Sequence, residues 1–75
     1  MAPEDVVSRV FGVERRRVDD ATSNTTLAEW DSLGHMTLVT ELETTYGISL
    51  SAEDALAMTD VAAIKRILRH RGARW

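Results

Sequence analysis

The segment from Asp31 to Gly47 constrains the fold of this chain more than any other part of it. Asp31 is a preferred capping residue at a helix start, and Gly47 is the residue type that most readily ends a helix. Apolar side chains between them recur at helical spacing and form one stripe, made of Leu38, Val39, Leu42 and Tyr46. The sequence therefore predicts a helix over Ser32–Tyr46, and the rest of the chain must cover its stripe.

Three more helices are expected, and no segment alternates in the way a strand would. The first covers Pro3–Phe11, and its core positions are Val6, Val7, Val10 and Phe11. Ser51 is a natural cap for a short helix over Ala52–Met58. Asp60 caps the last helix, Val61–His70, whose apolar face is Val61, Ile64, Ile67 and Leu68. The predicted fold class is all-α, a small four-helix bundle of three longer helices and one short helix.

A long polar connection, Gly12–Trp30, links the first two helices. Long loops without structure are unusual in compact domains, so we expect this one to lie against the helices. Its apolar anchors are expected to be Val13, Val18, Leu27 and Trp30. The basic run Arg15–Arg17 also lies here, and the sequence leaves open whether it is simply solvated or binds a partner.

The length of 75 residues sets the ceiling at one domain, residues 1–75. A domain this short buries only about 60% of the surface of its unfolded chain, which leaves little room for an enclosed active site. The sequence contains no cysteine, so a disulfide framework and a cysteine-based zinc site are both excluded.

The formal net charge of −3 argues against nucleic-acid binding, which needs a surplus of Lys and Arg to neutralise phosphates. No apolar run is long enough to span a bilayer, and the N-terminus lacks the basic start and apolar stretch of a secretory signal. We expect a soluble, monomeric protein of the cytoplasm, with neither nucleic acid nor membrane among its partners.

Two apolar residues near the start of the Ser32–Tyr46 helix do not fit the core stripe. Leu33 lies nearly opposite that stripe, and Met36 lies between the two directions, close to the line of Ser32. An apolar residue that points away from the core suggests a contact surface. Packing of Leu33 under the preceding loop is the alternative, and periodicity leaves both open.

Ser32 stands in the first turn of this helix, where backbone N–H groups lack intrahelical partners and the helix dipole is positive. A phosphate ester at that point would be stabilised without any basic side chain. The alternative is a plain capping serine, because serine is common at helix starts.

Residues Trp30–Met36, which read WDSLGHM, resemble the attachment motif of acyl carrier proteins. Later segments also match the pattern of that family, namely Leu38–Val39, Leu42–Glu43, Tyr46–Ile48, Ala55–Leu56 and Met58–Val61. The resemblance therefore covers almost the whole chain and follows the order of helices in the family.

In that family the serine of the Asp-Ser-Leu triplet receives 4'-phosphopantetheine from coenzyme A through a phosphopantetheinyl transferase. The resemblance implies that Ser32 is the covalent attachment site and that Asp31 and Leu33 flank the cofactor. The arm ends in a thiol that carries acyl groups as thioesters, so the protein itself has no catalytic residues. Acyl-loading and condensing or transferring enzymes are the implied partners, and their docking residues are expected to be Leu33, Met36, Thr37, Thr40 and Glu43.

Departures from the family pattern bear on the pathway. Carriers of fatty acid synthesis usually have acids at the places held here by Gly34, Thr37, Thr44 and Thr45. Glu41 and Glu43 are the remaining acids of the helix. The sequence of the motif is more similar to the motifs of discrete carriers from bacterial secondary-metabolite or polyketide-type pathways. A carrier of primary fatty acid synthesis and a helical interaction domain that carries nothing are the alternatives.

Catalysis and metal binding find little support among the residues. Ser32, His35 and Asp31 would need hydrogen-bond contact and an oxyanion hole to act as nucleophile, base and orienting group, and no Gly-x-Ser-x-Gly turn is present. His35 and His70 lack carboxylates at ligand spacing, so no metal site is expected. His35 either contacts the cargo of the arm or packs at the edge of the core, and the sequence does not decide between the two.

Overall fold

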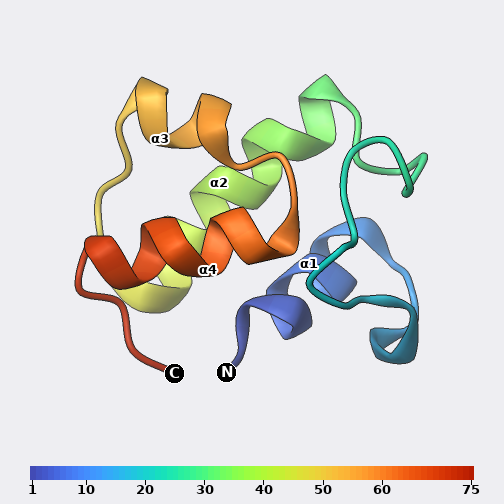
Figure 1. The fold of residues 1–75 in the computed structure, drawn as a ribbon, viewed down its shortest axis with the longest axis horizontal. Helices are drawn as coiled ribbons and strands as arrows, with labels where there is room; N and C mark the ends of the chain where they lie inside the picture. The colour runs from blue at the N-terminus through green and yellow to red at the C-terminus, as the bar shows by residue number, and fades with distance from the viewer.

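The computed structural model describes residues 1–75 as an all-helical bundle (Figure 1). Its helices are α1 (Pro3–Phe11), α2 (Ser32–Tyr46), α3 (Ala52–Ala57) and α4 (Val61–His70). The predicted fold class is confirmed, and three of the four helices have the predicted bounds. The short helix ends one residue earlier than predicted, because Met58 leaves the helical conformation and is buried in the core.

Polar side chains fix where the two later helices begin. The Ser51 hydroxyl accepts the Asp54 N–H at 3.0 Å, and the Asp54 carboxylate accepts the Ser51 N–H at 3.0 Å. This reciprocal arrangement satisfies two amide groups that a helix start leaves free. Asp60 caps α4 in the predicted way, since its carboxylate accepts the Ala63 N–H at 2.7 Å.

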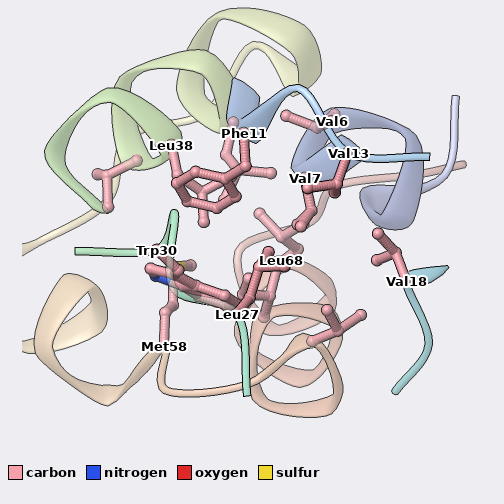
Figure 2. Packing of buried hydrophobic residues seen from close by; sticks show 14 of the residues in the cluster. Val6, Val7, Phe11, Val13, Val18, Leu27, Trp30, Leu38, Met58 and Leu68 are labelled. Atoms are coloured by element: carbon pink, nitrogen blue, oxygen red, sulfur yellow. The ribbon is translucent and has the colours of Figure 1, made fainter. Parts of the chain in front are cut away.

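Helices α1, α2 and α4 enclose the core, and Figure 2 shows their apolar side chains meeting there. The predicted α2 stripe is confirmed: Leu38 and Leu42 are fully buried, Val39 is nearly so, and Tyr46 packs at the edge. The predicted faces of α1 and α4 also point inward. Helix α3 differs from the other three because it contributes no buried residue.

The long connection lies against the helices, as predicted, and its four expected anchors are all buried. Backbone hydrogen bonds tie it to the start of α4: the Val61 N–H donates to the Thr22 carbonyl at 3.0 Å, and the Ala62 N–H donates to the Asp20 carbonyl at 3.1 Å. The last anchor, Trp30, therefore enters the core just before α2 begins.

Ion pairs hold the outer edge of the same connection. The Lys65 ammonium donates to Glu4 at 2.7 Å and to Asp20 at 2.6 Å, which joins α4, α1 and the loop. Hydrogen bonds to Asp20 and Glu4 raise the pKa of Lys65. Arg15, in the 3-10 turn Arg15–Arg17, pairs with Asp5 at 2.9 Å, so this arginine has an intramolecular role.

Both ends of the chain pack against Tyr46 and lie side by side in Figure 1. The Tyr46 hydroxyl donates to the Met1 carbonyl at 2.6 Å, and its ring meets Trp75 edge-on with centroids 5.9 Å apart. The Arg69 guanidinium lies 4.7 Å from the centre of the Trp75 ring. None of the helices has the length and apolar character that crossing a membrane requires.

Candidate functional site

Ser32 is the first residue of α2, and its side chain is exposed. The residue before it caps the helix: the Asp31 carboxylate accepts the Gly34 N–H at 2.7 Å. The interpretation of Ser32 as a plain capping serine is therefore wrong, because the capping position is already filled. The Ser32 hydroxyl stands in solvent at the positive end of a 15-residue helix.

A phosphate ester fits this position. The backbone N–H groups of Ser32 and Leu33 belong to the first turn, so they have no carbonyl partner within the helix. They are available to phosphate oxygens, and the helix dipole favours negative charge there. The neighbouring Asp31 carboxylate is negative and would repel a phosphate. One of its oxygens, however, accepts the Gly34 N–H of the helix.

A groove of about 550 Å³ opens beside Ser32. The connection, α2 and the segment from α3 to α4 all contribute to it, and its lining is Asn24, Trp30, Asp31, Ser32, His35, Met36, Leu56, Met58 and Thr59. Trp30 and Met58 are buried and form its floor, whereas Met36 and Leu56 are exposed on its rim. Sequence reasoning missed this groove, because it exists only where α3 lies next to the start of α2.

His35 connects three parts of the chain at this groove. The Trp30 indole N–H donates to His35 Nδ1 at 2.9 Å, and His35 Nε2 lies 2.7 Å from the Ala55 carbonyl oxygen. Because Nδ1 accepts and Nε2 faces an acceptor, these contacts match the tautomer that carries its proton on Nε2. Both nitrogens are thus engaged, so His35 does not act as a base toward Ser32.

Gly34 allows the connection to approach α2 closely. A Cβ at this position would lie 2.7 Å from the Phe11 ring and 2.9 Å from the Glu29 carbonyl oxygen, closer than real carbon atoms come. Gly34 stands at a place where carriers of fatty acid synthesis usually have an acidic residue. The structure gives a packing reason for the glycine.

Exposed apolar side chains surround Ser32. Leu33 is 79% exposed, Met36 62% and Leu56 80%. The alternative in which Leu33 packs under the connection is therefore wrong. We call Leu33, Met36 and Leu56 the rim patch. Leu56 was not among the predicted docking residues. In the sequence it is the one large apolar residue of a short helix, and the structure shows that this helix buries none of its residues.

The other predicted docking residues lie further along α2. Thr37 and Thr40 are exposed, and their hydroxyls donate back to the carbonyls of Leu33 and Met36 at 3.3 and 3.1 Å. Because both hydroxyls donate within the helix, the exposed face of α2 that carries these threonines offers a partner fewer free hydrogen-bond donors than two threonines could. Glu43 is half-buried, and its carboxylate accepts the Leu50 N–H at 2.8 Å. Its docking role stays a prediction, and its visible role is to hold the turn after α2.

The other acidic group of α2 is also engaged. Glu41 pairs with Arg9 of α1 at 3.4 Å. Near Ser32, the surface of α2 therefore presents apolar and threonine side chains, with Asp31 as its acid. No group of three or more His, Cys, Asp or Glu side chains is arranged to hold a metal ion.

Comparison with known proteins adds one match. A sequence model of a family described as "phosphopantetheine attachment site" matches residues 4–68, which include all four helices except the first residue of α1 and the last two residues of α4. No curated protein matches the chain.

Proposed function

Since the chain belongs to the phosphopantetheine attachment site family, whose members bind 4'-phosphopantetheine covalently, we propose that Ser32 is the residue that bears this arm. The domain is a carrier and not a catalyst. The family match also favours a carrier over an interaction domain that carries nothing. We propose further that residues 1–75 form a single carrier domain.

The observation that carries the proposal is the exposed Ser32 hydroxyl at a helix start that Asp31 already caps. A modifying enzyme can reach this oxygen without disturbing the fold. In the reaction, the oxygen of Ser32 forms the new bond to phosphorus, the nucleotide part of coenzyme A leaves, and the hydroxyl proton is released. The free N–H groups of the first turn then stabilise the phosphodiester charge.

The arm supplies, when attached, a terminal thiol that holds acyl groups as thioesters. The protein itself provides the attachment point and the groove beside it. The α2 start fixes the point from which cargo is presented, and the groove beside it offers Trp30 and Met58 as an apolar floor. Thr59 and Asn24 provide polar groups at the same groove.

Carrier domains of this family interact with phosphopantetheinyl transferases and with biosynthetic enzymes. We propose that these enzymes dock on the rim patch. Three large apolar side chains, each more than half exposed, stand around Ser32, and exposed apolar clusters of this kind are typical of protein contact surfaces. Asp31 and Leu33, next to Ser32, would meet the cofactor and the transferase together.

For the pathway, we propose a dedicated secondary-metabolite route of polyketide type over primary fatty acid synthesis. What supports this is the lack of free acids on α2: Glu41 pairs with Arg9, and Glu43 holds the Leu50 N–H. A partner that recognises its carrier through basic residues finds few opposite charges here. A partner with an apolar docking face can instead bind the exposed apolar side chains of the rim patch.

Intact mass spectrometry tests the attachment site. The protein is incubated with coenzyme A and a permissive phosphopantetheinyl transferase, and a gain of one phosphopantetheine is expected. Ser32→Ala should abolish the gain. Ser51→Ala is the matched control, because Ser51 is also an exposed serine at a helix start. A gain that persists in Ser32→Ala, or no gain with several transferases, would contradict the proposal.

The pathway proposal is tested by transfer kinetics. A malonyl transferase of fatty acid synthesis should load the modified protein poorly. Thr37→Glu and Thr40→Glu add acids on the exposed face of α2 and should raise the loading rate several-fold, because they restore attraction to a basic docking site. Efficient loading of the unchanged protein would favour primary fatty acid synthesis.

A further inference from the structure

Helix α3 is held in place mainly by polar contacts. It buries none of its residues, and Ala55 alone packs partly against the core. Its middle is tied to the end of α4, where Arg71 donates to Asp54 at 2.8 Å. The next residue ties it to α2, through the contact between His35 Nε2 and the Ala55 carbonyl at 2.7 Å.

The same histidine holds the floor of the groove. Trp30 is 3% exposed and lies between the groove and the core, with Phe11 and Leu38 on one side and Met58 on the other in Figure 2. Its ring packs on Phe11 with centroids 5.5 Å apart, and its indole N–H donates to His35 Nδ1. The imidazole and indole planes are within 15° of parallel, and their ring centroids are 6.1 Å apart.

We propose that His35 is a positioning residue that determines where the cargo lies: by fixing both Trp30 and α3, it closes the way from the groove to the core, so that an acyl group on the arm stays in the open groove. This inference rests on the proposed attachment to Ser32. Short or polar acyl groups are the cargo that suits such a site, since they lose little by remaining in contact with water.

The chemistry of the contacts explains why the way stays closed. An acyl chain that entered between α2 and α3 would have to move the Trp30 ring or the Ala55 backbone. Moving the ring leaves the buried indole N–H without its acceptor. Moving the backbone breaks the contact between His35 Nε2 and the Ala55 carbonyl, which keeps the Met58 N–H at 3.3 Å as its other partner. Neutral histidine provides one acceptor and one donor at opposite ends of a rigid ring, and both are used.

The experiment compares acetyl and octanoyl forms of the protein with its His35 variants. Each form is made by the transferase from the corresponding acyl coenzyme A, and intact mass verifies the loading. Thermal unfolding and the resonance of the Trp30 indole N–H are then measured. The resonance is assigned with Trp75→Phe, because the chain has two tryptophans. An acyl chain buried only in the folded state raises the melting temperature, whereas an exposed chain does not.

The wild type is expected to melt within about 1 °C in the two forms, with the same indole resonance. In His35→Ala, octanoylation should raise the melting temperature by about 5 °C and move the indole resonance. His35→Gln should restore the behaviour of the wild type, because glutamine also offers one acceptor and a donor. His70→Ala, which removes the other, exposed histidine, should behave as the wild type.

Several outcomes would overturn the inference. The first is an octanoyl-dependent stabilisation of the wild type; the second is an His35→Ala variant that responds no more than the wild type. If His35→Ala does not fold, the wild type and His35→Gln decide, and a response of either to octanoylation counts against the closed groove. If neither the acetyl nor the octanoyl form of the wild type can be made, the attachment to Ser32 is overturned, and the inference fails with it.

Discussion

The indole nitrogen of Trp30 and the Nδ1 atom of His35 lie 2.9 Å apart, and this hydrogen bond joins the end of the long connection to the first turns of α2. The two residues are five positions apart in the sequence and flank Ser32 on both sides. Ser32 thus lies in a short segment whose two ends, Trp30 and His35, are hydrogen-bonded to each other.

Gly34→Ala should destabilise the protein by about 1–3 kcal/mol, because the added methyl group would collide with the Phe11 ring and the Glu29 carbonyl. Chemical denaturation measures the change. Thr37→Ala, on the exposed face of the same helix, is the control and should change the free energy of unfolding by less than about 0.5 kcal/mol. Equal effects of the two substitutions would show that the close approach at Gly34 does not matter.

Lys65→Met should lower the free energy of unfolding by about 1–3 kcal/mol, because it removes the ammonium that donates to the largely buried Glu4 carboxylate at 2.7 Å and leaves this carboxylate only Arg15, at 3.8 Å. The Asp20 end of the connection also loses its tie to α4. Denaturation at neutral pH tests this. The exposed pair of Arg16 and Glu14 provides the comparison, and Arg16→Met should cost little.

Tyr46 should ionise at unusually high pH. Burial, followed by the negative charges of Asp5 and Glu4, raises its pKa from 10.0 to about 12. Because the folded-state pKa is the higher one, the corresponding stability is complete below pH 10 and is lost as pH rises through 12. Tyr46 is the single tyrosine, so tyrosinate absorbance reports it directly. A midpoint near 10 in the folded protein would contradict the packing at the chain ends.

Asp54 should keep its charge at lower pH than an ordinary aspartate. The hydrogen bond from Arg71, then that from the Ser51 backbone, lowers the pKa of Asp54 below 3.8. The stability that this provides is present above pH 3.8 and is lost as pH falls through the lowered value. Arg71→Gln should raise the pKa of Asp54, measured by carboxyl NMR titration, and speed amide exchange in α3. An unchanged pKa in this variant would exclude the contact.

Leu56→Asp should weaken transfer to partner enzymes by about tenfold or less, as removal of one exposed contact residue does, while leaving helicity unchanged. Leu33→Asp and Met36→Asp should act in the same direction, because all three belong to the rim patch. Ala57→Asp, exposed on the same short helix, is the control for added charge. Transfer rates that drop equally in the control would point to charge and not to the apolar contact.

The local sequence was sufficient for most of the fold. Capping side chains and stop glycines act over a few residues, so Asp31, Gly47, Ser51 and Asp60 marked their helix ends without knowledge of the rest. The exposure of Ser32 also followed from local rules, since it stands at a helix start. Periodicity left Leu33 undecided, because a helix start can be covered by a loop that the period does not describe.

The sequence by itself determined the helices, the core stripe and the motif around Ser32, because each depends on neighbours along the chain. Tertiary structure alone decided which distant groups meet: Ala55 at His35, Glu29 and Phe11 at Gly34, and Leu56 on the rim of the groove. These contacts depend on how α3 and the long connection are placed against α2. No repeating pattern records that placement, since it results from packing among segments far apart in the chain.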